Sequence, residues 1–337
     1  MRTHNRFKPH LNEANSHFLT LSQVDIAMEL TNCNLCGSNA IEDERVIPDY
    51  LLERKQIVAR LVRCRACGLV YQSPRPTLAE MSEHYPPEYE PYTDPTAGYE
   101  PSSLLKRAYA YGTQKRTRYV TRRKHGGRLL DIGCASGTFL LGMQAQRGWQ
   151  VQGVEPSAQI AEYARSVHNL DVFPGTLEEA NFPDGSFDCV TMWDVLEHVH
   201  DPLGTLREIS RVLKDDGILV IRVPNLASWD ATLFGDAWAG LDAPRHLFVF
   251  RPETLKAMLA QTNFQMIDLS CGIGGYVTFV LSVRFWMTAH RWPEKIKQRV
   301  ARLLYHPASR LISAPFFWVP SALKRGPLMV VTAQKRP

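Results

Sequence analysis

The chain has 337 residues, of which 45% are hydrophobic and 22% are charged, and its formal net charge is +5. This apolar content excludes global disorder, and the length fits one large domain with an appendage, or two domains. No stretch reaches about 18 uninterrupted apolar residues, so a membrane-spanning helix is not expected. Seven cysteines and no signal-peptide pattern predict a reducing, cytoplasmic location.

The N-terminal part begins with a polar, basic stretch, residues 1–27, which is expected to be a loose tail. Residues 28–72 contain two Cys-x-x-Cys pairs, and the four cysteines are Cys33, Cys36, Cys64 and Cys67. Two such pairs complete a tetrahedral metal site, so they predict a small zinc-ribbon-like module with structural Zn²⁺. A redox pair and incidental buried thiols are the alternatives. Four protein ligands leave no open position, so no catalysis is assigned to this metal.

Residues 73–127 connect this module to the rest of the chain. From Ser73 to Ser103 there are seven prolines and several tyrosines, which predict an extended strap that covers the substrate cleft or packs on the core. Leu104 to Lys124 follows with helical composition, many Lys and Arg residues and no acidic residue. Such a helix either presents a solvated basic face or attracts phosphate groups.

The stretch from Leu129 to Leu140 reads as a buried strand, a glycine-containing turn and the start of a helix. Glycines at such a turn let a ligand approach the backbone. About 20 residues later, Glu155 ends the next short strand, where a carboxylate is placed to bind a ribose diol. The turn has no Lys or Arg for a pyrophosphate, which favours an adenosine cofactor without phosphates.

Strands and helices then alternate with short connections. A helix with Ser157 as N-cap is expected to end at His168, and further strands are predicted at 171–174, 186–194 and 218–223. This alternation predicts an α/β fold with a parallel sheet that is covered on both faces.

The turn Asp131-x-Gly133-x-Ala135-x-Gly137 and the later stretch Leu196-Glu197-His198-Val199 resemble class I S-adenosylmethionine-dependent methyltransferases. Ala135 stands where many members have a glycine. The resemblance implies a Rossmann-like seven-stranded sheet formed by residues 128–272, with residues 327–337 as an antiparallel last strand. The cofactor-binding residues that it implies are Asp131, Gly133, Ala135, Gly137, Glu155, Pro156, Leu177, Glu178 and Asp194.

The loop from Asp242 to Pro252 follows the fifth strand, where the resemblance places substrate residues. His246 is the candidate base for methyl transfer, although a histidine that only fixes the loop is the alternative. His198 is the rival base. Arg245 and Asp242 are the candidate substrate-binding residues, and Arg245 suits an acidic or phosphorylated acceptor.

The four-cysteine module, the methyltransferase core and the C-terminal segment together resemble the sugar C-methyltransferases and related glycan methyltransferases. In those enzymes a Glu-His pair in the corresponding loop supplies the base, whereas here Arg245 replaces the glutamate. O-methylation of a sugar or of a lipid-linked glycan is therefore at least as well supported as C-methylation.

Residues 273–326 interrupt the core before its last strand. They combine many large apolar side chains with nine Lys or Arg residues and a single acid, Glu294. This composition suits helices that lie on an anionic membrane surface, such as the inner face of the cell membrane. A helical cap on the core or a dimer contact is the alternative, and the oligomeric state stays open.

The leading functional hypothesis is an S-adenosylmethionine-dependent methyltransferase that acts on a sugar, a glycan or a lipid-linked small molecule. A quinone-type lipid O-methyltransferase is one alternative. A second is an RNA methyltransferase that uses the zinc module and the basic helix, although the strand 186–194 lacks the Asn/Asp-Pro-Pro-Tyr motif used on base amines, so nucleic acid is an unlikely partner. A non-catalytic cofactor-binding scaffold is a third.

Overall fold

The computed structural model of the protein describes residues 27–85, 103–272 and 274–336. The predicted tail, apart from Ala27, and the proline-rich part of the strap at 86–102 lie outside the described residues.

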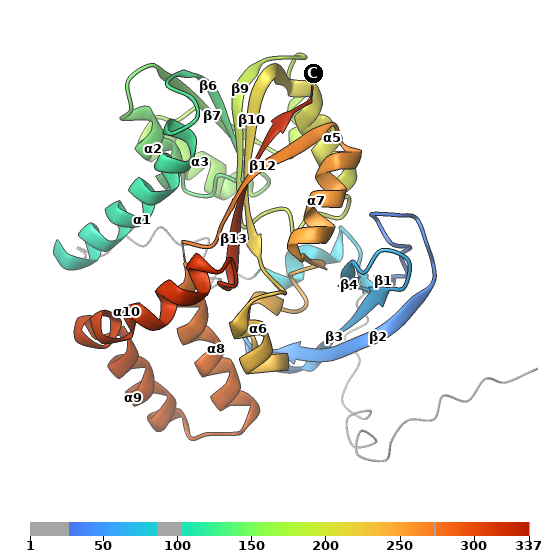
Figure 1. The fold of residues 1–337 in the computed structure, drawn as a ribbon, viewed down its shortest axis with the longest axis vertical. Helices are drawn as coiled ribbons and strands as arrows, with labels where there is room; N and C mark the ends of the chain where they lie inside the picture. The colour runs from blue at the N-terminus through green and yellow to red at the C-terminus, as the bar shows by residue number, and fades with distance from the viewer. Residues whose placement is uncertain (1–26, 86–102, 273, 337) are drawn as a thin grey trace, which may run out of the picture.

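A seven-stranded sheet forms the centre of the molecule, with the strand order β12-β13-β10-β9-β6-β7-β8 (Figure 1). β10, β9, β6, β7 and β8 run parallel, and β13 is antiparallel to both of its neighbours. The fold prediction, including the antiparallel last strand, is confirmed. The strands are β6 (Gly127–Ile132), β7 (Trp149–Glu155), β8 (Val172–Pro174), β9 (Phe187–Trp193), β10 (Leu213–Pro224), β12 (Phe264–Ser270) and β13 (Leu328–Lys335).

Helices cover both faces of this sheet because successive strand residues point to opposite sides. In β6, Leu130 packs in the same apolar cluster as Leu206 and Met258, whereas Leu129 packs with Leu140 and Ala161 on the other face. The first face carries α5 (Pro202–Val212) and α7 (Pro252–Gln261), and the second carries α1 (Ser103–Thr121), α2 (Thr138–Gln144) and α3 (Ala158–His168). The short α4 (Leu177–Ala180) follows β8.

Side-chain caps set the start of several helices. The predicted N-cap is confirmed, since the hydroxyl of Ser157 accepts a hydrogen bond from the N–H of Ile160. Thr176 and Glu179 form a capping box at the start of α4. Asp201 caps α5, with Pro202 in the first turn.

A second sheet joins the N-terminal module to the core. Its strand order is β11-β4-β3-β2, and it combines β2 (Ile41–Asp49), β3 (Arg54–Cys64) and β4 (Val70–Gln72) with β11 (Phe248–Val249), a strand that follows β10 in the core. A smaller sheet pairs β1 (Met28–Glu29) with β5 (Arg75–Pro76). The side chain of Asn34 accepts a hydrogen bond from the N–H of Leu203 at 3.0 Å, so the module also contacts the start of α5.

A buried arginine adds an ion-pair network at the same junction. The guanidinium of Arg245 donates to both carboxylate oxygens of Asp49, at 2.8 and 3.1 Å, and to Asp242 at 2.7 Å. The side chains of Arg245 and Asp49 are 0% exposed. Two carboxylates around one guanidinium compensate for the loss of its hydration and attach the end of β2 to the loop after β10.

The segment between β12 and β13 is helical, as predicted, and consists of α8 (Gly275–Ala289), α9 (Glu294–Tyr305) and α10 (Pro307–Ala322). α8 packs on α6 (Trp229–Phe234) and on the 3-10 turns η4 (Gly235–Ala237) and η5 (Ala239–Leu241). A further 3-10 turn, η2 (Glu80–His84), belongs to the described start of the strap. Within the described ranges, no helix is long and apolar enough to cross a membrane.

We expect Arg245→Met to lower the free energy of unfolding by about 3–5 kcal/mol, because it leaves two buried carboxylates without their cation. Urea denaturation measures this change. The control is Arg165→Gln on α3, which removes an exposed pair with Glu162 and should change stability by no more than about 1 kcal/mol. Equal, small effects of both variants would show that the Arg245 network contributes little.

Candidate cofactor and acceptor site

The predicted cofactor turn has the backbone that its glycines require. Gly133, Ala135 and Gly137 have φ angles of 64°, 47° and 82°. A Cβ on Gly133 would lie 2.6 Å from the side chain of Val195, and one on Gly137 would lie 2.2 Å from Leu170. Both positions therefore demand glycine. Ala135 adopts the left-handed conformation with a methyl group, at a cost of roughly 1–2 kcal/mol.

The carboxyl ends of β6, β7 and β9 bring Asp131, Glu155 and Asp194 to one edge of the sheet, where α/β folds bind their ligands. Asp131 is buried and accepts a hydrogen bond from the hydroxyl of Thr191 at 2.6 Å. Burial raises the pKa of Asp131 to about 7, even though Thr191 and the charge of Arg116 oppose the shift.

Glu155 is buried and connects the turn to the next helix. One of its carboxylate oxygens accepts the N–H of Ala135 and the other accepts the N–H of Ser157, both at 3.0 Å. Burial raises the pKa of Glu155, and these two backbone donors oppose that shift. Each oxygen keeps a second lone pair, so the carboxylate can hold the turn and still accept a bond from a ribose hydroxyl.

Asp194 also has a left-handed backbone, with φ 59°, and it forms an ion pair with Arg222 of β10 through both carboxylate oxygens. The guanidinium carbons of Arg222 and Arg116 lie 5.7 and 5.9 Å from the ring centre of Trp193. Burial and the charge of Arg222 lower the pKa of Arg116 to about 10, while Asp194 and Asp131 oppose that shift.

Arg116 belongs to the predicted basic helix, and no local sequence pattern distinguishes it from the other cations there. Two more cations of this region form salt bridges, since Arg123 lies 3.8 Å from Asp268 and Lys124 contacts Asp216. Arg116 is thus the cation of this helix that reaches the edge of the sheet, whereas Arg123 and Lys124 follow the helix and pair with exposed carboxylates. The Nε1 of Trp193, beside Arg116, is buried and has no hydrogen-bond partner among the described residues.

The remaining predicted cofactor residues differ in exposure. Leu177 is buried in the core, whereas Pro156 and Glu178 are exposed. Glu178 accepts a hydrogen bond from the hydroxyl of Thr205 at 3.2 Å, which connects α4 to α5. These residues lie after β7 and β8, at the same edge of the sheet as Glu155.

The two candidate bases lie against one another, with the ring centres of His198 and His246 4.6 Å apart. The Nδ1 of His246 lies 3.0 Å from the carbonyl oxygen of Gly240. A carbonyl oxygen only accepts hydrogen bonds, so Nδ1 carries the proton and Nε2 has the free lone pair. Burial lowers the pKa of His246, and Asp242 and the Gly240 carbonyl oppose that shift.

His198 is partly buried and is held through Nδ1, which lies 2.8 Å from the hydroxyl of Tyr85 and 3.1 Å from the carbonyl oxygen of Arg245. Burial and the neighbouring His246 lower the pKa of His198 to about 3. Tyr85 ends the described part of the predicted strap, so this tyrosine does reach the candidate site.

Glu197 is a residue of this cluster that the sequence analysis quoted only as part of a family motif. Its side chain is fully buried, and neither carboxylate oxygen has a hydrogen-bond partner among the described residues. Burial and the charge of Asp194 raise its pKa well above the usual range. The ligand-type atoms of Glu197, His198 and His246 lie within 4.8 Å of one another. No sequence pattern could place residue 246 beside residues 197 and 198.

The predicted substrate residues are Arg245 and Asp242. Arg245 is fully buried and bonded to two carboxylates, so the geometry favours a structural role for it. Asp242 lies between Arg245 and His246, and its carboxylate is 4.0 Å from the Nε2 of His246. Although burial acts in the opposite direction, the positive charge of Arg245 lowers the pKa of Asp242.

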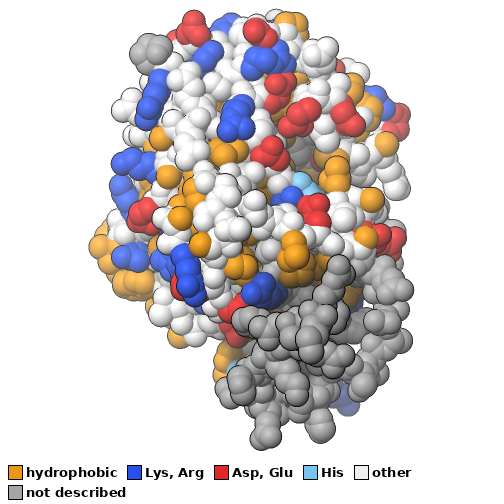
Figure 2. Space-filling view, turned by 90° about the vertical axis from the view of Figure 1, so that its right-hand side faces the viewer, with side chains coloured by type: hydrophobic (Ala, Val, Ile, Leu, Met, Phe, Trp, Pro, Cys, Tyr) orange, Lys and Arg blue, Asp and Glu red, His pale blue; other side chains and the backbone are white. Residues whose placement is uncertain are grey.

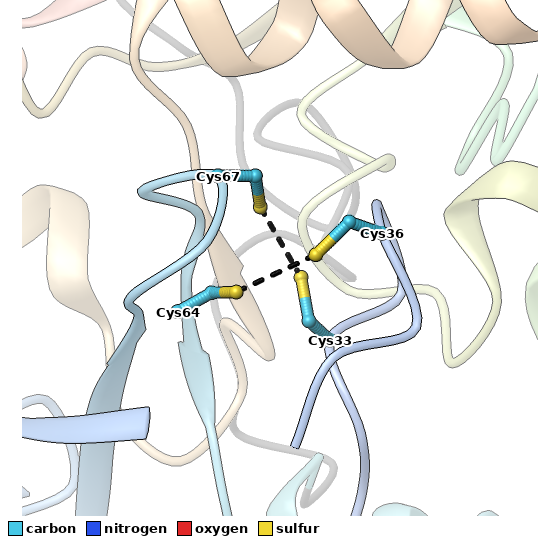
Figure 3. Close-up of side chains that lie close together, drawn as sticks. All are labelled: Cys33, Cys36, Cys64 and Cys67. Atoms are coloured by element: carbon cyan, nitrogen blue, oxygen red, sulfur yellow. Dashed lines mark hydrogen bonds between the residues drawn. The ribbon is translucent and has the colours of Figure 1, made fainter. Parts of the chain in front are cut away.

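The four predicted metal ligands gather at one point (Figure 3). The sulfur atoms of Cys33 and Cys67 are 3.4 Å apart, and those of Cys36 and Cys64 are 3.5 Å apart. Gly37 and Gly68 close the two turns by donating their N–H groups to the carbonyl oxygens of Cys33 and Cys64. Sulfur ligands of a tetrahedral zinc ion at the usual bond length are roughly 3.8 Å apart, so this arrangement fits the metal.

A family model described as "Methyltransferase domain" matches residues 104–269. An uncharacterized methyltransferase of Schizosaccharomyces pombe is 32% identical over 119 residues, which are 31% of this chain and 42% of that protein. A ubiquinone biosynthesis O-methyltransferase of Xanthomonas oryzae is 31% identical over 158 residues, covering 43% of this chain and 65% of that one.

A solved structure of a possible histamine N-methyltransferase from Thermotoga maritima aligns with 76% of this chain and 98% of its own, at 19% identity and a TM-score of 0.46. The [4+2]-cyclase SpnF aligns with 66% of this chain and 80% of its own, with a TM-score of 0.44. The chain spans less than two thirds of the length of the two curated relatives named above. The family model describes residues 104–269 as a methyltransferase domain, and such a domain implies S-adenosylmethionine as the methyl donor.

The histidine pair predicts how stability depends on pH. The pKa of His198 is about 3 in the folded protein and ordinarily 6.5, so between these values only the unfolded chain binds the proton. Stability should therefore fall as the pH drops below 6.5, by at most about 1.4 kcal/mol per pH unit from this group. We expect His198→Gln to flatten the dependence between pH 6 and 4 in urea denaturation. The exposed His290→Gln is the control, and equal slopes for both variants would contradict the prediction.

Proposed function

We propose that this protein transfers a methyl group from S-adenosylmethionine to a hydroxyl or an enolic carbon of a sugar, a glycan or a lipid-linked small molecule. The single observation behind this proposal is the state of His246. It is a neutral histidine with Nδ1–H donated to Gly240 and its Nε2 lone pair free, in a cluster that begins three residues after Asp194 at the cofactor edge.

The cofactor side of the site is built from this chain's own acids and cations. Glu155 is the proposed ligand of the cofactor's ribose. It accepts the N–H of Ala135, so the turn from Gly133 to Gly137 lies beside it and is the proposed backbone contact of the cofactor. Arg116 supplies a cation for the carboxylate of the cofactor's methionine part, and the unpartnered Nε1 of Trp193 adds a donor. When bound, S-adenosylmethionine supplies an electrophilic methyl on a sulfonium.

On the acceptor side, Nε2 of His246 would take the proton of the acceptor's hydroxyl or enol O–H. The acceptor's oxygen or enolic carbon would gain the methyl group, and S-adenosylhomocysteine would leave as the methyl–sulfur bond breaks. The neutral state of His246 is maintained by burial, and the nearby carboxylate of Asp242 stabilises the imidazolium that forms. The ring of His198 packs against that of His246, and the backbone carbonyl of Glu197 accepts the N–H groups of Leu247 and Phe248. In this proposal Arg245 maintains the loop rather than binding the acceptor.

A quinone-type lipid O-methyltransferase is the second candidate, and the named relative from Xanthomonas oryzae favours it. Both candidates need a base for a hydroxyl, and they differ in the acceptor. The RNA alternative gains less support, because Arg116, Arg123 and Lys124 of the basic region are engaged with the core.

We also propose that the four-cysteine cluster holds one structural Zn²⁺. Although burial opposes it, backbone N–H groups of Cys67 and Ala66 lower the pKa of Cys64 to about 7, whereas burial raises the pKa of Cys33 and of Cys67. The support for the metal is therefore the convergence of the four sulfur atoms. Cys33 and Leu35 share one apolar cluster with Leu196 and Leu247, the neighbours of Glu197 and His246. In this proposal the metal stabilises the apolar cluster that holds Glu197 and His246 in place, and it takes no part in the chemistry.

The proposed roles predict different effects of two variants. Glu155→Gln should weaken binding of S-adenosylhomocysteine by about tenfold or more, because it removes a charged acceptor for the ribose. His246→Gln should bind this product normally and lose transfer of labelled methyl by about 10²-fold or more. Calorimetry measures binding of S-adenosylhomocysteine. A labelled-methyl screen measures methyl transfer, with nucleotide sugars, polyprenyl-linked sugars, prenylated phenols and RNA as acceptors.

The exposed Glu162→Gln on α3 is the control and should leave both measurements unchanged. Normal product binding by Glu155→Gln would refute the cofactor role, and full activity of His246→Gln would remove it as the base. Label in RNA alone would overturn the proposed acceptor class.

The zinc proposal predicts about one zinc per chain in purified protein. Cys36→Ser should lose the metal and lower stability, because removal of one thiolate opens the tetrahedral site. Cys271→Ala, a buried cysteine outside the cluster, should retain the metal. Metal analysis together with thermal unfolding decides the matter, and metal-free wild-type protein of normal stability would rule out a structural zinc.

A further inference from the structure

We propose that the α8–α10 hairpin, residues 274–326, docks on an anionic phospholipid surface. Its helix α10 presents an apolar stripe that no other described residue covers. Leu311, Ile312 and Trp318 are 76%, 80% and 71% exposed. Leu311, Pro315 and Trp318 follow the helical spacing of one face, and Ile312, Phe316 and Val319 lie beside them. A contiguous stripe of exposed apolar side chains marks an interaction site.

Cations lie beside this stripe. Arg299 precedes the 65% exposed Leu303 by one helical turn on α9, and Arg302 is its neighbour. Arg310, in the first turn of α10, lies over the ring of Tyr276. Within residues 274–326 only Lys297 forms an ion pair with a carboxylate, namely with Glu53 and Glu294. The other cations of the hairpin have no acidic partner within hydrogen-bond distance in the described chain.

Charge decides between a lipid surface and a second copy of the chain. A symmetric dimer through α10 would bring identical patches together, so the unpaired cations of each copy would meet those of the other. An anionic lipid surface neutralises these cations and receives the apolar side chains at the same time. Exposed tryptophans such as Trp318 and Trp292 suit the boundary between headgroups and acyl chains.

A pocket of about 250 Å³ lies between the three helices, and Phe316 of the apolar stripe is part of its lining. Aromatic and aliphatic side chains dominate its lining, namely Tyr276, Phe279, Leu304, Phe316 and Phe317. An apolar pocket that opens beside an apolar stripe suits the end of a lipid chain. The face that carries α5 and α7, in contrast, mixes acidic and basic side chains and shows only scattered hydrophobic groups (Figure 2).

The hairpin is also joined to the candidate acceptor site. The hydroxyl of Ser282 in α8 accepts the N–H of Ala239 at 3.0 Å, and the next residue, Gly240, holds the ring of His246. The hairpin is therefore connected through α8 to the segment that orients the candidate base. The docking proposal does not depend on methyl transfer. If both are correct, the acceptor or its carrier is in the membrane.

The test is flotation of the full chain with two kinds of vesicle, phosphatidylcholine alone and phosphatidylcholine with phosphatidylglycerol. We expect binding to the second kind that weakens with added salt. The double variant Leu311→Ser/Trp318→Ser should bind more than roughly tenfold more weakly. Its control is Leu78→Ser/Val167→Ser, which changes apolar residues that are exposed elsewhere.

The electrostatic part is tested with Arg299→Gln/Arg302→Gln, which should weaken binding roughly 30-fold, because each cation near an anionic surface contributes about fivefold. Arg147→Gln/Lys256→Gln removes two exposed cations outside the hairpin and is the matched control. Light scattering measures the mass of each protein in solution and so shows whether it is a monomer or a dimer.

Absence of binding to the anionic vesicles overturns the proposal. So does a dimeric wild-type protein that fails to bind lipid and becomes monomeric when Leu311 and Trp318 are replaced, since the stripe is then a contact between copies. Equal loss of binding in a control pair and its test pair would also overturn it. Retained binding of S-adenosylhomocysteine in any of these cases leaves the proposed methyl transfer standing.

Discussion

The ion pairs of Arg245 hold together parts of this protein that lie far apart in its sequence. The guanidinium contacts Asp49 at the end of β2 and Asp242 at the start of the loop that carries His246. The carbonyl oxygen of the same arginine contacts the ring of His198. Because its charge is fully buried, any displacement that separates it from either carboxylate is costly. One residue thus fixes the N-terminal module, the loop after β10 and both candidate bases.

A second group of opposite charges lies at the carboxyl edge of the seven-stranded sheet. Asp131 and Asp194 face Arg116 and Arg222 around the ring of Trp193, and they come from α1, β6, β10 and the residue after β9. Burial moves the pKa of Asp131 upward and that of Arg116 downward, so ionising either group at this edge has an electrostatic cost. Perturbed charges at the carboxyl edge of a parallel sheet are typical of a site that binds a charged ligand.

The additions to the core converge on the same edge. The four-cysteine turns pack against the residues that flank Glu197 and His246, and η5 connects His246 to α8 of the hairpin. Lys297 of α9 forms an ion pair with Glu53 of the N-terminal module. The module and the hairpin are thus connected to each other as well as to the core. Changes in either can reach the candidate base through a few contacts.

The sequence by itself determined the alternating strands and helices, the glycine turn and the two cysteine pairs. These features depend on local spacing, because a strand, a tight turn or a Cys-x-x-Cys pair is encoded within a few residues. It also marked Glu155, Asp194 and His246 as candidates, since each follows a strand where a parallel sheet binds ligands.

Only the tertiary structure decided what surrounds those residues. It gave Arg245 two buried carboxylates, turned Arg116 toward Trp193, and placed Glu197 beside His246 without a hydrogen-bond partner in the described chain. It also left the apolar stripe of α10 uncovered. Burial and ion pairing depend on residues up to 244 positions apart, and no local pattern encodes such distances. The fold was therefore readable from the sequence, whereas the environment of each charge was not.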